Sequence, residues 1–152
     1  ATHLWFNGDA RQAVSFYVSL IPNSRIIDDC TLENGGPNED TEYRAMKFEI
    51  AGTSYLALDK SPFTFTLATS IFLVCETQDE IDRLWAGFLD NGGTPLQCGW
   101  LTDRFGLNWQ IAPAGILHMI TEKSEAGRRA AKAMMSMVKF DIAALRAAYA
   151  GA

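Results

Sequence analysis

Only a few polar side chains in this sequence are suited to chemistry, and the first of them is His3. An imidazole titrates near neutral pH, so His3 could act as a general base or as a metal ligand. The alternative is an exposed histidine at the end of a strand. Asn108 and Gln110 carry side-chain amides, which could orient a ligand by hydrogen bonding inside a mostly apolar pocket.

Several aromatic side chains could form the apolar part of such a pocket. Trp5 follows His3 by two residues, so the two side chains share one face if this segment is a strand. Aromatic residues elsewhere fit pocket lining and ordinary core packing equally well. The predicted pocket comprises His3, Trp5, Phe63, Phe65, Trp100, Asn108 and Gln110.

The two amides belong to a predicted strand, turn and strand that run from Cys98 to Pro113 (CGWLTDRFGLNWQIAP). The turn at residues 103–106 ends in a glycine, which tolerates the positive φ of a hairpin corner. Residues 107–111 then alternate with period two, which puts Trp109 and Ile111 on the face packed under helices. Asn108 and Gln110 therefore lie on the opposite face.

The remaining elements fall into two similar halves. In the first half we expect strands at residues 3–6, 24–30, 43–50 and 53–58, a helix from Ala10 capped by Asp9, and a loop at 32–41. In the second half we expect strands at 70–75 and 94–100 and a helix that begins with a capping box at Thr77 and Glu80. The pattern of the tail after residue 122 predicts two helices joined at residues 139–141, with Asp141 as the N-cap of the second helix.

An internal repeat relates the two halves, because FYVSLIPNS at 16–24 matches LWAGFLDNG at 84–92 with a constant offset of 68. Each copy reads as strand, helix and three strands, and such a unit cannot bury its sheet alone. We therefore predict an α+β fold of two paired βαβββ modules whose concave faces meet over a cleft. The predicted single domain spans 1–152, with module one at 1–60, module two at 68–115 and a helical tail at 122–152.

Composition and charge limit the classes of partner. The chain has 152 residues, a net charge of −5 and a pI near 4.9, so neither nucleic acid nor an anionic membrane is expected. Three widely spaced cysteines without a C-x-x-C motif favour reduced thiols and a cytoplasmic location. The methionines of the tail suggest an interface, and we expect a homodimer that binds a small molecule. Because the sequence begins at Ala1 without Met, we also expect a short N-terminal piece to be missing or processed.

Three segments together resemble a known family, and the similarity runs over nearly the whole chain, tail included. They are LWFNG at 4–8, FYVSLIPNS at 16–24 and, above all, the long motif at 98–113. They resemble the PhnB-like branch of the vicinal oxygen chelate (glyoxalase/bleomycin resistance/dioxygenase) superfamily, which often carries the label 3-demethylubiquinone-9 3-methyltransferase. The resemblance implies paired βαβββ modules.

The resemblance also implies where a divalent metal would bind, namely on the first and last strands of each module. The first-strand histidine position corresponds to His3, and the final-strand carboxylate position corresponds to Gln110. The corresponding first-strand position in module two is near Ser70 or Ile71. The ligand set is therefore degraded, and a tightly bound catalytic metal is not expected. Glu49 is a spare carboxylate whose face strand parity alone does not determine.

Three functions remain in competition, and the sequence leaves open whether the protein is an enzyme. The first is binding of a small organic molecule in an apolar cleft without a cofactor. The second is a metal-dependent lyase, isomerase or dioxygenase in which His3, Glu49 and Gln110 hold Zn, Fe, Mn or Mg. The third, weaker interpretation is the methyltransferase of the family label, although no Gly-rich strand-to-helix loop is present.

Overall fold

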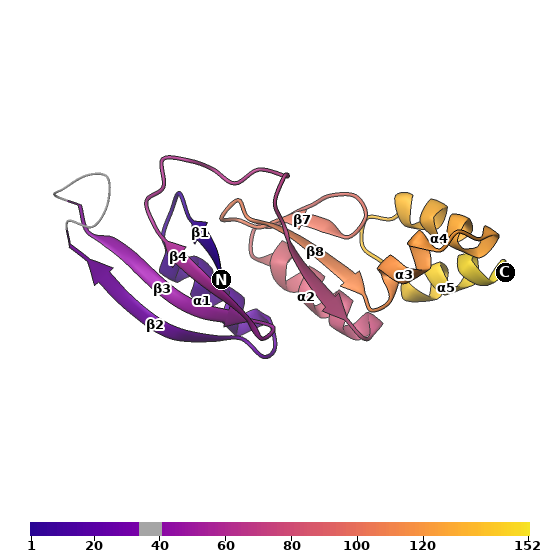
Figure 1. Ribbon diagram of the computed structural model, residues 1–152, viewed down its shortest axis with the longest axis horizontal. Coiled ribbons are helices and arrows are strands. Elements are labelled where there is room, and N and C mark those ends of the chain that lie inside the picture. The colour runs from indigo at the N-terminus through magenta and orange to yellow at the C-terminus, as the bar shows by residue number, and fades with distance from the viewer. Residues whose placement is uncertain (34–40) are drawn as a thin grey trace. The chain divides into compact units, whose positions relative to one another are not determined.

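A computed structural model describes residues 1–33 and 41–152 of the chain (Figure 1). The chain divides into two compact units, Ala1–Phe65 and Thr66–Ala152, which we call unit 1 and unit 2 and describe separately. Most of the loop expected at 32–41 lies outside the described residues.

Unit 1 is a four-stranded sheet with one helix. It contains β1 (Thr2–Trp5), α1 (Ala10–Leu20), β2 (Arg25–Leu32), β3 (Tyr43–Ile50) and β4 (Thr53–Leu58). The strand order is β1-β4-β3-β2, with β1 parallel to β4 and the other pairs antiparallel. Asp9 caps α1 as predicted, because its side chain accepts hydrogen bonds from the amides of Arg11 and Gln12.

The core of unit 1 lies between α1 and the sheet. Val14 and Tyr17 of α1 are fully buried, and Phe48 of β3 is buried with them. A tight turn joins β3 to β4, and both of its central residues, Ala51 and Gly52, have positive φ. This geometry matches the right-handed twist of the strands and confirms the predicted hairpin.

Unit 2 repeats the same topology. It contains β5 (Ile71–Cys75), α2 (Gln78–Asp90), β6 (Thr94–Pro95), β7 (Trp100–Thr102) and β8 (Asn108–Pro113). The order β5-β8-β7-β6, with β5 parallel to β8, is the order of unit 1 with each strand replaced by its counterpart. The predicted repeat of βαβββ modules is confirmed.

The core of unit 2 is centred on Trp109, whose side chain is fully buried and lies 5.0 Å, ring centre to ring centre, from Phe88 of α2. The indole nitrogen of Trp109 donates to the buried carboxylate of Asp103 at 2.8 Å. The other oxygen of Asp103 accepts from the amides of Phe105 and Leu107, so this residue closes the turn between β7 and β8. The predicted role of Asp103 in the turn is confirmed.

Three helices lie in the tail, which we define as residues 116–152: the two predicted within 122–152 and a shorter one before them that was not predicted. They are α3 (Ile116–Thr121), α4 (Glu125–Met135) and α5 (Ile142–Ala150). The helix α3 was missed because its N-cap, Gly115, makes no side-chain hydrogen bond and gives no capping signal. Asp141 caps α5 as expected by accepting from the amide of Ala144.

The strand predicted at 94–100 is interrupted between β6 and β7, because the tail docks there. The amides of Cys98 and Gly99 donate to the carbonyls of Met137 and Val138, at 2.8 and 2.7 Å. The ring of Phe140 packs directly on Gly99, where a Cβ atom would come within 2.3 Å of it. Bonds to the tail thus replace the strand pairing that the sequence pattern suggested.

No helix in the described ranges combines the length and the apolar character that crossing a membrane requires.

Candidate functional site

The candidate site of unit 2 is the sheet face turned away from α2, which we call its far face. Strand register determines which side chains lie there. Gln110 of β8 pairs with Phe72 of β5 on one side and with Trp100 of β7 on the other. Because Trp109 and Ile111 are buried on the α2 side, Gln110 and both partners lie on the far face. The face predicted for Gln110 is therefore the one observed.

The far face of unit 2 is largely apolar. Phe72 is 37% exposed and Val74, two residues along β5, is 60% exposed. A groove of about 370 Å³ lies at β7, two strands away from β5 in the sheet order, and its walls are Leu67, Leu96, Gln97 and Trp100. Trp100 was a predicted pocket residue, whereas the other three wall residues were not. No periodic pattern identifies Leu67 or Leu96, since both lie in connections between strands.

Gln110 has one half of its amide engaged. Its nitrogen donates to the hydroxyl of Ser70 at 2.8 Å. Among the described residues, no hydrogen bond to its oxygen is recorded. The Ser70 contact therefore orients the amide, and its oxygen can accept a hydrogen bond from a ligand.

Asn108 has a structural role that the sequence did not suggest. Its side chain is only 2% exposed, and its amide nitrogen donates to the carbonyls of Thr66 and Thr69 at 2.7 and 3.2 Å. Its oxygen accepts from the hydroxyl of Thr102 at 2.8 Å. These bonds hold the segment that carries Leu67, so Asn108 shapes the groove and its amide is saturated by protein groups.

In unit 1, His3 and Trp5 lie on the face turned away from α1, the far face of that unit. His3 is exposed, and its register partner on β4 is Leu56. The indole nitrogen of Trp5 donates to the carbonyl of Asp59 at 2.8 Å, and its ring meets Phe63 edge to face at 5.9 Å. His3 and Trp5 thus share a face, as the parity of the strand predicts.

The two predicted phenylalanines of the connector differ in position. Phe63 is 67% exposed beside Trp5. Phe65 packs edge to face on Phe6 at 5.2 Å, and Phe6 is buried against Tyr17 of α1. Phe65 therefore extends the core of unit 1 on the α1 side, away from His3 and Trp5.

Glu49 lies on the far face of unit 1, but it is already paired. Its carboxylate accepts from the guanidinium of Arg25 at 2.8 Å, and this hydrogen bond lowers the pKa of Glu49. Glu49 is on β3 and His3 is on β1, with β4 between them. Two strand spacings separate them by about 10 Å, so the two residues do not form a common ligand set.

Strand register identifies the neighbours of His3 and Gln110, the two ligand positions that the resemblance implies. Leu56 of β4 pairs with His3 in unit 1, and Phe72 of β5 pairs with Gln110 in unit 2. The resemblance put the first-strand position of module two near Ser70 or Ile71. Ser70 lies beside Gln110, whose amide nitrogen donates to its hydroxyl, and Ile71 is buried.

These donors do not fit a tightly bound divalent metal. They are the imidazole of His3 and the neutral amide of Gln110, and the side chains that pair with them across the strands, Leu56 and Phe72, are apolar. Within residues 1–33 and 41–152, no group of three or more His, Cys, Asp or Glu side chains could hold a metal ion.

Comparison with known proteins follows the same division of the chain. A family model described as 3-demethylubiquinone-9 3-methyltransferase matches residues 1–112. A PhnB protein from Bacillus cereus is 32% identical, with a TM-score of 0.63, and the match covers 75% of this chain and 98% of that one. The sequence predicted a resemblance over nearly the whole chain, tail included. The family match ends at residue 112, so the tail lies outside the matched region.

More distant solved structures share the fold alone. A protein from Pseudomonas aeruginosa is 22% identical, with a TM-score of 0.54 and coverage of 74% of this chain and 94% of that one. The fosfomycin resistance protein FosX from Listeria monocytogenes, complexed with Mn(II) and sulfate, is 15% identical, with a TM-score of 0.54 and coverage of 72% and 86%. A comparison with curated proteins gave no match.

Proposed function

The chain belongs to the 3-demethylubiquinone-9 3-methyltransferase family of PhnB-like proteins, in the vicinal oxygen chelate superfamily, and from this premise we propose that it binds a small, mainly apolar organic molecule without a tightly bound catalytic metal. One observation carries the proposal. Leu56 and Phe72 are the register partners of His3 and Gln110, the two positions that the resemblance assigns to metal ligands. Neither side chain can donate electrons to an ion, and both favour contact with an apolar molecule.

The far face of unit 2 offers what such a ligand requires. Phe72, Val74 and the groove beside Trp100 supply apolar surface. The oriented amide of Gln110 supplies a hydrogen-bond acceptor next to Phe72 and Trp100. A compact molecule with a flat apolar body and one N–H or O–H donor would use both features, since apolar pockets gain orientation from a few polar groups.

Binding or sequestration is the activity that these groups support. Conversion of a ligand would need a nucleophile or a poised acid and base near it. On the far face of unit 2, the side chains that register identifies are amides, hydroxyls, aromatic rings and aliphatic groups. His3 is the imidazole on the far face of unit 1, and its register partner there is Leu56.

The metal-dependent alternative, a lyase, isomerase or dioxygenase with His3, Glu49 and Gln110 as ligands, has less support. Glu49 is bound to Arg25 and is two strands away from His3. To bind a metal ion together with His3, Glu49 would have to leave Arg25 and its side chain would have to move across two strands of the sheet. Equilibrium dialysis that finds one Zn²⁺, Fe²⁺ or Mn²⁺ per chain, lost in the variant His3→Ala, would favour this alternative over the proposal.

The methyltransferase named in the family description also lacks a supporting site. The turn from β1 to α1 contains Gly8 as its single glycine, and the turn from β5 to α2, at Glu76 and Thr77, contains none. A nucleotide-type cofactor usually needs a Gly-rich loop at such a turn. Calorimetry should give no heat of binding for S-adenosylmethionine, and a saturable signal would support the methyltransferase instead.

We also propose that the protein is a homodimer and that it is located in the cytoplasm. The dimer is supported by apolar side chains exposed on the tail, such as Met135 at 62% and Val138 at 43%. Such side chains gain free energy when a second surface covers them. Light scattering coupled to size-exclusion chromatography should give twice the chain mass, and a monomer at micromolar concentration would contradict the dimer.

The binding proposal can be tested with the uncharged dye N-phenyl-1-naphthylamine, which has a flat apolar body and one N–H donor. Its fluorescence should rise on binding to protein dialysed against EDTA. The variant Trp100→Ala should weaken binding about tenfold, because it removes an aromatic wall of the groove. The matched control is Ile27→Ala, which truncates an exposed apolar residue of β2 in unit 1 and should bind the dye normally.

Two results would overturn the proposal. One is an unchanged affinity in Trp100→Ala, which would put the dye elsewhere. The other is dye binding that disappears with EDTA and returns with a divalent ion.

A further inference from the structure

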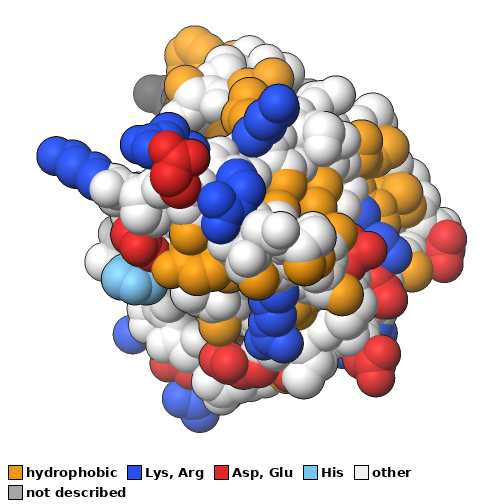
Figure 2. Space-filling view, turned by 90° about the vertical axis from the view of Figure 1, so that its right-hand side faces the viewer, with side chains coloured by type: hydrophobic (Ala, Val, Ile, Leu, Met, Phe, Trp, Pro, Cys, Tyr) orange, Lys and Arg blue, Asp and Glu red, His pale blue; other side chains and the backbone are white. Residues whose placement is uncertain are grey.

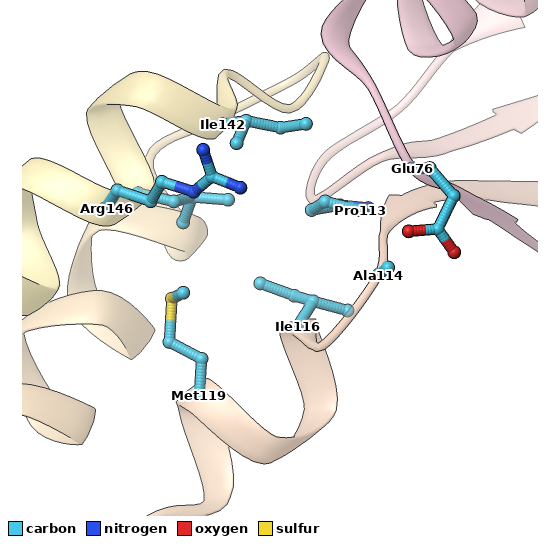
Figure 3. A pocket seen from close by; sticks show the side chains of 8 residues that line it. Glu76, Pro113, Ala114, Ile116, Met119, Ile142 and Arg146 are labelled. Atoms are coloured by element: carbon cyan, nitrogen blue, oxygen red, sulfur yellow. The ribbon is translucent and has the colours of Figure 1, made fainter.

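A second cavity lies in unit 2, where the end of β8 meets the tail (Figure 3). Its volume is about 240 Å³. The module contributes one wall through the ends of β5 and β8, and α3 and α5 of the tail contribute the others. The lining residues are Glu76, Pro113, Ala114, Ile116, Met119, Ile142, Leu145 and Arg146.

The tail is folded back so that its apolar side chains face the end of the sheet. The amide of Ala114 donates to the carbonyl of Cys75 at 2.8 Å, which extends the pairing of β5 and β8 to the edge of the cavity. Ile142, Leu145 and Arg146 have the spacing that brings residues to one side of a helix. One side of α5 therefore offers the cavity two apolar side chains and one cation.

Arg146 is the charge that faces the cavity. Its side chain extends from α5 into the space beside Ile142 and Met119 (Figure 3). The carboxylate of Glu76 lies on the opposite side of the cavity from Arg146, near Ala114 (Figure 3). A ligand inside would therefore meet apolar walls with the Glu76 carboxylate at one side and the Arg146 guanidinium at the other, and a guanidinium binds carboxylates through two parallel N–H donors.

The other two arginines of the tail interact with protein groups. Arg128 is paired with Glu125. Arg129 donates to the carbonyls of Ala148 and Tyr149 at 2.9 and 2.7 Å. Across the described residues, neither a hydrogen bond nor an ion pair is recorded for the Arg146 side chain, so its donors are available to a ligand.

The charge of the tail also favours an anion. Residues 116–152 contain six Lys or Arg and three Asp or Glu, a net charge of +3 in a chain whose total is −5. Figure 2 looks at the side where the tail helices lie, and it shows blue cationic side chains interspersed with orange apolar ones and with some red acidic ones. An anion approaching this surface would be attracted in spite of the acidic total charge.

The size of the cavity limits the ligand. A volume of about 240 Å³ corresponds to roughly eight water molecules at about 30 Å³ each. We propose that the cavity binds a small monocarboxylate with a compact apolar body, its carboxylate paired with Arg146 and its apolar part packed on Ile142 and Met119. This site is separate from the far face of unit 2, and five of its eight lining residues belong to the tail, outside the family match.

Benzoate, tested against the uncharged analogue benzamide, is a suitable probe. In protein with ¹³C-labelled Ile and Met methyl groups, benzoate should shift the NMR signals of Ile142 and Met119 and leave Met46 of unit 1 unchanged. The variant Arg146→Gln should weaken benzoate binding about tenfold, because it removes a charge-assisted hydrogen bond. The control Arg128→Gln removes another tail arginine, which lies outside the cavity, and should bind normally.

A second variant tests the cavity itself. Ala114 is exposed at its wall, so Ala114→Leu should fill space and weaken benzoate binding while Arg146 stays in place. Equal affinities for benzoate and benzamide, or normal binding by Arg146→Gln, would overturn the inference. So would shifts confined to methyl groups around Trp100, a result that would leave the proposed function standing.

Discussion

The far faces of the two units carry different side chains on the same strand topology. On unit 1, Glu49 is paired with Arg25, and Lys47 stands beside Asp28 in the strand register. On unit 2, the corresponding surface consists of aromatic rings and neutral amides, with Phe72, Gln110 and Trp100 in one row across three strands. The faces that pack on α1 and α2 are by contrast apolar in both units.

This difference shows that folding constrains the side chains on only one face of each sheet, the face packed on the helix, and that the far face is free to vary between the two modules. Burial against a helix demands apolar side chains on one face of each sheet. The far face has no such demand, so unit 1 carries ion pairs there beside Trp5 and Leu56, whereas unit 2 carries aromatic and neutral polar side chains. The contrast also explains why the candidate ligand surface is assigned to unit 2, although His3 lies on unit 1.

The largest effect is expected where unit 2 differs most from unit 1, at the docking of the tail. Gly99→Ala should lower the free energy of unfolding by about 3 kcal/mol or more, because the backbone has positive φ and the new methyl would overlap Phe140. Gly106→Ala shares the positive φ but has no atom within 4 Å of its Cβ position, so it should cost only about 1 kcal/mol. Urea unfolding measures both, and equal losses would mean that the tail does not press on Gly99.

Thiol reactivity provides the next contrast, between Cys30 of unit 1 and Cys75 of unit 2. Burial raises the pKa of Cys75 from 9.0 to about 11, with Glu80 adding to the effect. The thiolate fraction of Cys75 at pH 8 is then about a hundredfold below that of an ordinary thiol. Cys30, in contrast to the buried Cys75, is exposed to solvent. Labelling with a disulfide reagent should modify Cys30 first and reach Cys75 only slowly.

The sign of the stability effect at Cys75 follows from the same pKa shift. A raised pKa in the folded state favours the protonated thiol, so this contribution is intact below pH 9 and is lost as the pH rises toward 11. Thermal unfolding should therefore occur at lower temperature across this range. Cys75→Ser should reduce that dependence, and an unchanged pH profile in the variant would assign it to other groups.

A smaller effect is expected when metal ligands are restored to unit 2. The double variant Phe72→His with Gln110→Glu would place an imidazole and a carboxylate on neighbouring parallel strands in direct register. Zn²⁺ affinity should rise about tenfold or more over the natural chain, because both groups ligate this ion. Leu56→Glu beside His3 makes the same pair in unit 1 and should act similarly. Calorimetric titrations that show no gain in either would contradict the register assignment.

The smallest effect concerns the ion pair on the far face of unit 1. The hydrogen bond from Arg25 lowers the pKa of Glu49, so its stabilising contribution is present above the ordinary pKa of 4.5 and is lost as the pH falls. In Arg25→Gln the pKa of Glu49 should return toward its ordinary value, as followed by NMR of the carboxyl carbon. Lys132→Gln, on α4 of the tail, is the control; an unshifted pKa in Arg25→Gln would mean the pair does not persist in solution.

Local patterns in the sequence predicted much of the fold. The alternation at residues 107–111 placed Trp109 and Gln110 on opposite faces, and capping residues such as Asp9 and Thr77 marked helix starts. These signals succeed because they depend on neighbours in the chain. The break between β6 and β7 was missed because it depends on hydrogen bonds from the amides of Cys98 and Gly99 to carbonyls of the tail, about 40 residues later.

The candidate site was predicted less completely, for related reasons. Phe72 was missed because β5 is apolar on both faces, so its register became clear only from the pairing with β8. The structural role of Asn108 depends on the carbonyls of Thr66 and Thr69, to which no local pattern points. Trp100 could be identified as a candidate because an aromatic residue near two amides suits a ligand pocket.

The central claim is that unit 2 binds an apolar molecule on its far face without a metal. The most direct test is methyl NMR of EDTA-treated protein during titration with N-phenyl-1-naphthylamine. The account predicts shifts at Leu67, Val74 and Leu96, which lie on or beside this face, and none at Ile27 of unit 1. Absence of those shifts until Zn²⁺ or Mn²⁺ is added would contradict it.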